Sequence, residues 1–254
     1  MKRSNKTPRA KRLYADHVIH AFAFVFLCLF AVTETRNLIL EHGIHKSSVF
    51  RALLLCVICA LFYLGAILRE GRTHSDRPLR ATMILFFLLY VYLLVNLTLL
   101  DKSLGRGTIS ATTDDAARRA VYLERYVNLR PFESIWQVYV KGFMNGYVNT
   151  YYTLLNLIGN ICALMPLALF LPYFWRKQRK RYVFLGTMLV TVLCIEGLQL
   201  LFMVGSCDVD DLILNVGGAY LMYAILRLSP MQRLTEALVK RNIFEKNQGN
   251  TAQF

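Results

Sequence analysis

The chain has 254 residues, of which 56% are hydrophobic, and its mean hydropathy is +0.39. This hydrophobic fraction exceeds the apolar share of about 45–50% that is usual in soluble domains. The apolar residues form runs of about 20, the length of helix that crosses a bilayer, and show no alternating β pattern. The composition excludes an ordinary soluble domain and predicts an all-α polytopic transmembrane helical bundle.

The formal net charge is +14, and most Lys and Arg residues lie in four segments, 1–17, 69–80, 175–181 and 229–254. These segments alternate along the chain so that all four share one side of the membrane. This positive-inside pattern predicts that both termini are cytoplasmic and that the basic segments touch anionic membrane lipids. The charge therefore does not indicate a nucleic-acid partner.

Six spans are predicted, over roughly 18–40, 49–68, 81–100, 151–174, 182–203 and 212–228. The first follows a basic segment but has no small-residue cleavage site, which favours a retained helix over a signal peptide. The predicted organisation is a basic cytoplasmic tail (1–17), a two-helix N-terminal extension (18–80), a membrane core (81–228) and a polar cytoplasmic tail (229–254).

The longest loop, 101–150, divides into two parts. Residues 101–120 are polar and are expected to be loop-like, whereas 121–148 are dense in aromatic side chains. The spacing of Phe132, Trp136, Tyr139 and Phe143 predicts a short amphipathic helix. Aromatic side chains favour the membrane interface, so this segment is expected at the outer surface.

Two predicted spans carry polar side chains near their outer ends. Asn156 and Asn160 share one face of the fourth span, and Glu196 and Gln199 share one face of the fifth. The asparagines could equally clamp two helices together. Glu196 has no nearby Lys or Arg in the sequence, which favours a protonated carboxyl group or a bound cation. Close helix packing is expected at small residues of the spans: Gly159, Gly217 and Gly218.

The segment between the last two spans is acidic. Asp208 is predicted to cap the sixth helix, with Asp211 as its third residue and Asn215 one turn further on the same face. Asp210 is expected to point into solvent. Cys207 is expected to be exposed and has no evident partner.

The order of these motifs resembles the VanZ-like family of membrane proteins. The resemblance covers roughly 81–228 and rests on Asn128-Leu129-Arg130-Pro131-Phe132, Asn156-Leu157-Ile158-Gly159-Asn160, Pro166, Glu196 and Gln199, Asp208-Val209-Asp210-Asp211 and Asn215-Val216-Gly217-Gly218. It implies a protein of the bacterial cytoplasmic membrane, in a family whose namesake is associated with lowered susceptibility to the glycopeptide teicoplanin.

This chain departs from the family pattern in two places. Arg130 stands where relatives usually have an apolar residue. The segment 205–207 stands where many relatives have an arginine before the aspartates.

Three functions remain open on the sequence. The first is binding of a cell-envelope ligand, a glycopeptide or a lipid-linked cell-wall precursor. The second is a membrane-embedded enzyme with Glu196 and Asp211 as catalytic residues, or with Glu196, Asp208 and Asp211 as oxygen ligands of Mg²⁺ or Ca²⁺. The third is an ion-coupled transporter. The candidate ligand-binding residues are Asn128, Arg130, Asn156, Asn160, Gln199, Asp208 and Asn215.

Overall fold

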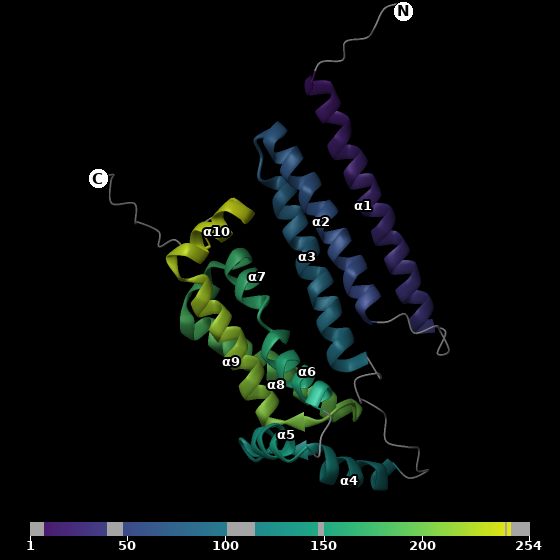
Figure 1. The fold of residues 1–254 in the computed structure, drawn as a ribbon, viewed down its shortest axis with the longest axis vertical. Helices are drawn as coiled ribbons and strands as arrows, with labels where there is room; N and C mark the ends of the chain where they lie inside the picture. The colour runs from purple at the N-terminus through teal and green to yellow at the C-terminus, as the bar shows by residue number, and fades with distance from the viewer. Residues whose placement is uncertain (1–7, 40–47, 101–114, 147–149, 242, 245–254) are drawn as a thin grey trace, which may run out of the picture. The chain divides into compact units, whose positions relative to one another are not determined.

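The computed structural model describes residues 8–39, 48–100, 115–146, 150–241 and 243–244 (Figure 1). The chain forms two compact units, Met1–Leu88 and Leu89–Phe254, and the division falls inside helix α3.

The first unit is built on an antiparallel helix pair. Helices α1 (Pro8–Ile39) and α2 (Ser48–Thr73) lie side by side, and α3 (Arg77–Val95) follows after a short turn (Figure 1). The ring of His20 meets Phe62 edge to face with the centroids 6.2 Å apart. A Cβ atom on Gly65 would lie 2.5 Å from the same ring, so only glycine leaves room for His20 at this contact.

The second unit holds a longer series of elements. In chain order they are η1 (Asn96–Leu100), α4 (Asp115–Tyr126), β1 (Val127–Asn128), η3 (Ile135–Lys141), α5 (Gly142–Asn145), α6 (Thr150–Ala163), α7 (Leu167–Phe174), η4 (Arg176–Arg179), α8 (Arg181–Phe202), β2 (Cys207–Asp208), α9 (Val209–Leu226) and α10 (Ser229–Val239).

Helix α9 is the central element of this unit, because α6, α7, α8 and α10 all pack against it. A Cβ atom on Gly218 would lie 1.9 Å from the carbonyl oxygen of Ile161, so glycine allows α6 and α9 to approach closely. Near the other end of α9, the rings of Phe184 and Tyr223 stack with centroids 4.4 Å apart. These contacts confirm the close packing predicted at Gly218. Neither Gly159 nor Gly217 has a neighbour within 4 Å of an added Cβ.

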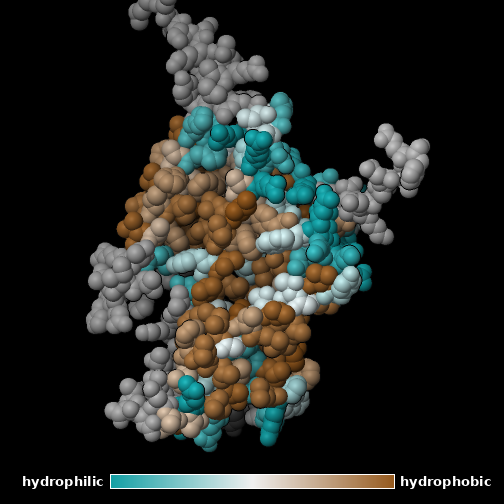
Figure 2. All heavy atoms as spheres, turned by 180° about the vertical axis from the view of Figure 1, so that it is seen from behind, coloured by the Kyte–Doolittle hydropathy of each residue, from teal (hydrophilic) through white to brown (hydrophobic). Residues whose placement is uncertain are grey.

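Six segments among the described residues are long and apolar enough to cross a membrane: Ala15–Glu34, Leu54–Gly71, Arg77–Leu99, Asn156–Phe174, Arg181–Phe202 and Val209–Leu226. They confirm the predicted all-α polytopic bundle. Many large apolar side chains on these segments are exposed. Figure 2 shows hydrophobic residues over much of the visible surface, with hydrophilic residues in separate groups. Such a surface suits lipid contact.

The predicted fourth span is confirmed, and it is built from two helices. Helix α6 ends at Ala163, a turn follows, and α7 begins at Leu167 with Pro166 as its N-cap. Proline has no backbone N–H, and its ring clashes with the carbonyl group four residues earlier in a helix. Pro166 therefore breaks the helix where the run of apolar residues alone predicts continuity.

The long loop contains more helix than expected. Helix α4 begins at Asp115, so residues 115–120 are helical rather than loop-like. The predicted amphipathic helix over 132–143 is largely a π-helix, η3, followed by the single turn α5. The wider π turn changes which side chains share a face, and a 3.6-residue period cannot anticipate that change.

Candidate functional site

A two-residue parallel strand pair joins two parts of the chain that are about 80 residues apart. Val127 pairs with Cys207, and Asn128 pairs with Asp208. This register places the start of the Asn128–Phe132 motif beside the N-terminus of α9 (Figure 1). The strand pair therefore brings two of the sequence motifs together.

The carboxylate of Asp208 caps α9, as predicted, by accepting a hydrogen bond of 2.9 Å from the Asp210 backbone N–H. It also accepts hydrogen bonds from the Ser134 hydroxyl and, at 3.3 Å, from the Asn128 side-chain amide. The Asn128 amide oxygen in turn accepts a bond of 3.0 Å from the Arg130 backbone N–H. Asp208 and Asn128 therefore hold loop 129–135 against the N-terminus of α9.

Asp210 does not point into solvent, which corrects the sequence prediction. Asp210 is only 1% exposed. Its carboxylate accepts hydrogen bonds from the backbone N–H groups of Phe132 and, at 2.9 Å, Ile135. Phe132 has a φ of +64°, an uncommon conformation for a non-glycine residue. We call Asn128, Ser134, Asp208 and Asp210 the docking network. The role of Asp210 was missed because the sequence does not show where loop 129–135 lies.

Glu196 and Asp211 form a second group, which we call the carboxylate pair. The Asn160 amide of α6 donates a hydrogen bond to the Asp211 carboxylate, and Asp211 is near enough to Glu196 for their charges to interact. The Cys207 thiol and the Asp208 backbone N–H lie against the Glu196 carboxylate. Thus α6, α8 and α9 bring Asn160, Glu196 and Asp211 together, as the sequence predicts.

The buried position of Glu196 leaves part of its carboxylate unused. The residue is 9% exposed, and its Oε2 atom is buried without a hydrogen-bond partner among the residues that the structure describes. Within the same part of the chain, neither Glu196 nor Asp208 forms an ion pair with Lys or Arg. A buried carboxylate oxygen without a donor is costly, so a ligand or a proton at Oε2 would be stabilising.

Cys207 has a partner, contrary to the sequence prediction. Burial, together with the neighbouring carboxylates of Glu196, Asp208 and Asp211, raises the pKa of its thiol to about 11. At neutral pH the thiol therefore keeps its proton and can donate it in a hydrogen bond to Glu196. Cys207 is therefore a further residue beside the carboxylate pair. The only signal for it in the sequence is its position directly before Asp208, the predicted N-cap.

Gln199 is buried, but its contacts are structural. Its side-chain amide donates a 2.9 Å hydrogen bond to the Thr98 backbone carbonyl, and its backbone carbonyl accepts one of 3.3 Å from the Tyr122 hydroxyl. Burial raises the pKa of the Tyr122 phenol, and the nearby Cys207 and Glu196 add to the effect. Gln199 and Tyr122 therefore link α8 to η1 and α4 next to the carboxylate pair.

Three other predicted ligand-binding residues are Asn215, Asn156 and Arg130. The Asn215 side-chain amide donates to the Asp211 backbone carbonyl at 2.8 Å. Asn156 is exposed one turn before Asn160. The Arg130 side chain is 84% exposed and pairs with Glu133 at 3.7 Å.

The metal ligands predicted from the sequence are Glu196, Asp208 and Asp211. In the parts of the chain that the structure describes, no group of three or more His, Cys, Asp or Glu side chains could hold a metal ion. Asp208 already accepts three hydrogen bonds in the docking network. The carboxylates of Glu196 and Asp211 can accept hydrogen bonds or a proton.

A comparison with known protein families identifies the family of this chain. The model of the family described as VanZ/LLP1 matches residues 87–230, which is more than half of the chain and includes the docking network and the carboxylate pair. No curated protein and no solved structure matches the chain.

Proposed function

The chain belongs to the VanZ/LLP1 family, and from this premise we propose that it is a bacterial cytoplasmic-membrane protein that binds a cell-envelope ligand at Glu196 and Asp211. The single observation that carries the proposal is the buried Oε2 atom of Glu196, which has no donor among the described residues. A bound ligand would supply that donor. The proposed ligand is a glycopeptide or a lipid-linked cell-wall precursor, in keeping with the family's association with teicoplanin susceptibility.

The chemistry of the carboxylate pair favours particular parts of such a ligand. Ionised carboxylates only accept hydrogen bonds, so they suit peptide N–H groups, sugar hydroxyls or an ammonium group. Two carboxylates repel a phosphate unless a cation lies between them. We therefore propose that the peptide or sugar part of the ligand occupies the carboxylate pair and that any phosphate lies elsewhere.

The test is a thermal-stability screen of the detergent-purified protein with teicoplanin, a lipid-linked precursor, Mg²⁺ and Ca²⁺. We expect one envelope ligand to raise the Tm of the wild type and to leave Glu196→Gln unchanged. Glu124→Gln, which removes an exposed carboxylate from α4, is the matched control and should respond as the wild type does. If no ligand raises the Tm, or if Glu196→Gln responds fully, the binding proposal is wrong.

A membrane-embedded enzyme is the second candidate, and the same free oxygen favours it. Glu196 would act as general base with Asp211 beside it, since an unpartnered carboxylate oxygen can accept a proton. The experiment is product formation from a lipid-linked precursor by the purified wild type, Glu196→Gln and Asp211→Asn. We expect both variants to insert into the membrane and to form no product. Product formation at the wild-type rate by both would remove the enzyme hypothesis.

A further inference from the structure

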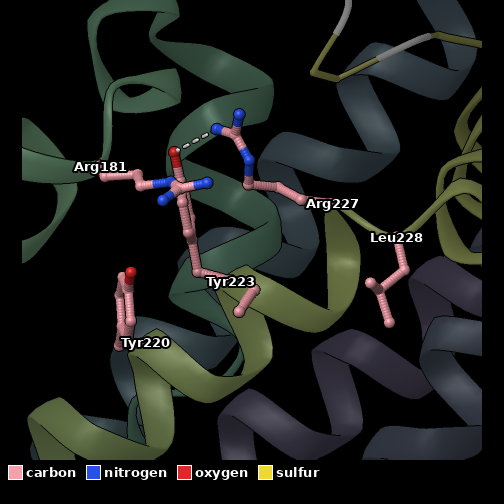
Figure 3. A pocket seen from close by; sticks show the side chains of 6 residues that line it. Arg181, Tyr220, Tyr223, Arg227 and Leu228 are labelled. Carbon is pink, nitrogen blue, oxygen red and sulfur yellow. Dashed lines mark hydrogen bonds between the residues drawn. The ribbon is translucent and has the colours of Figure 1, made fainter.

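A cavity lies at the basic end of the second unit, away from the carboxylate pair. It has a volume of about 410 Å³ and is lined by Arg181, Tyr220, Tyr223, Ala224, Arg227 and Leu228 (Figure 3). Its walls come from the beginning of α8 and the end of α9 and the residues after it. Arg181 and Glu196 are separated by about 22 Å along α8, at 1.5 Å per residue, so the two sites lie near opposite ends of a span.

Arg227 is held in place by several contacts. Its Nη1 atom donates hydrogen bonds of 3.1 Å to the Arg179 carbonyl and 3.1 Å to the Tyr223 hydroxyl, the second of which Figure 3 shows. The Tyr223 hydroxyl donates to the same Arg179 carbonyl at 2.6 Å. The guanidinium also lies over the rings of Tyr223 and Phe244, at 5.6 and 5.5 Å. Arg227 is therefore oriented before any ligand arrives.

The cavity still has unused hydrogen-bond donors. Among the described residues, no hydrogen-bond partner is present for three groups of the cavity. They are the Nε and Nη2 atoms of Arg227, the guanidinium of Arg181 and the hydroxyl of Tyr220. In the same part of the chain, no Asp or Glu pairs with Arg181 or Arg227. Two arginines without a carboxylate partner form a site that attracts an anion, and the planar guanidinium matches the geometry of a phosphate.

The surroundings add a positive field and an apolar edge. Five of the six residues over 176–181 are Lys or Arg, and the sequence has no Asp or Glu from 163 to 195. Ala224 and Leu228 contribute apolar surface to the same cavity. Because α8 and α9 are predicted spans, the cavity lies where an apolar span ends, at the depth of lipid headgroups.

We propose that this cavity binds the phosphate of an anionic phospholipid headgroup. Arg181 and Arg227 would contact the phosphate oxygens, Tyr220 would donate from its hydroxyl, and Ala224 and Leu228 would contact the glycerol and the first methylene groups. The cavity volume is of the size that suits a small organic ligand rather than a single ion.

The experiment measures binding of water-soluble short-chain phosphatidylglycerol to the full-length protein in neutral detergent, with short-chain phosphatidylcholine and inorganic phosphate as separate probes. We expect phosphatidylglycerol to bind and the other two to bind at least about tenfold more weakly. Equal binding of phosphatidylcholine would contradict recognition of an anionic headgroup. Equal binding of inorganic phosphate would assign the cavity to a soluble anion and would overturn the lipid proposal.

Two matched pairs of variants locate the binding. Arg181→Gln should weaken phosphatidylglycerol binding about tenfold through loss of a charge-assisted contact, whereas Arg176→Gln, which removes an exposed charge outside the cavity, should leave it nearly unchanged. Tyr220→Phe should weaken binding and Tyr182→Phe, on an exposed tyrosine, should not. Equal losses within both pairs would show only diffuse attraction to the basic surface and would sink the proposal. The Tm of each variant without lipid checks that it folds.

Discussion

Asp208, Asp210 and Asp211 lie within one helical turn, and each carboxylate meets different partners. Asp208 caps α9 and accepts hydrogen bonds from the side chains of Asn128 and Ser134. Asp210 accepts hydrogen bonds from backbone N–H groups of loop 129–135. Only Asp211 faces Asn160 of α6 and the charge of Glu196. The first two carboxylates therefore hold loop 129–135 to α9, whereas Asp211 lies beside Glu196 at the proposed ligand site.

Asp210→Asn should destabilise the protein, because a side-chain amide accepts only through its oxygen and its NH2 group would face the other of the two backbone donors. The expected loss is about 1–3 kcal/mol, the usual cost of a buried donor without a partner. Thermal unfolding in detergent measures it, with Glu124→Gln as a surface control that removes the same charge. A Tm equal to that of the wild type would show that the bonds to Phe132 and Ile135 do not hold loop 129–135.

Cys207 gives a chemical report on Glu196. Because only the thiolate reacts and the pKa of this thiol is raised to about 11, alkylation should be slow at pH 8 and should accelerate as the pH rises toward 11. Glu196→Gln removes a negative charge beside the thiol, which lowers its pKa, and should speed alkylation at pH 8 several-fold. Mass spectrometry of the modified peptide gives the rate, and Cys207→Ser gives the background. An unchanged rate in Glu196→Gln would contradict the contact between the two side chains.

At the scale of elements, the contact between α6 and α9 positions Asn160 against Asp211. It depends on Gly218, since any side chain there would collide with the backbone of Ile161. The break at Pro166 also shapes this region, because α6 and α7 each pack against α9 as separate helices.

Gly218→Ala should therefore destabilise the protein by about 1–3 kcal/mol through overpacking between helices. Gly217→Ala is the matched control, since no neighbour lies within 4 Å of its added Cβ and alanine favours the helix by about 1 kcal/mol. Thermal unfolding of both variants tests the contact. Equal Tm values for the two would mean that α6 and α9 do not approach closely at Gly218.

At the scale of the whole molecule, the distribution of charge predicts which side of the membrane each end of the second unit faces. Cysteine labelling in intact bacteria tests it. In a Cys207→Ser background, Ser206→Cys should react with an impermeant thiol reagent, and Lys177→Cys should react only after the cells are opened. Position 206 is chosen because it is exposed and because the native Cys207 thiol reacts slowly. The opposite pattern would place the carboxylate pair on the cytoplasmic side.

The sequence by itself determined the class of protein, the six spans and three of the residues that meet at the carboxylate pair. Those features depend on local patterns in the chain. The thickness of the bilayer sets the length of the apolar runs, and helix geometry sets which residues share a face. Asn160, Glu196 and Asp211 could be placed together because antiparallel spans bring their polar ends to one level.

Only the tertiary structure decided how the neighbouring polar residues are used. The pairing of β1 with β2 joins residues about 80 positions apart. It places Asn128, Asp208 and Asp210 in the docking network, where they bind one another or loop 129–135. The same packing leaves Arg130 exposed and brings Cys207 to Glu196. No local pattern encodes such contacts, because they depend on which hydrogen-bond donors a distant loop carries when it meets the end of α9.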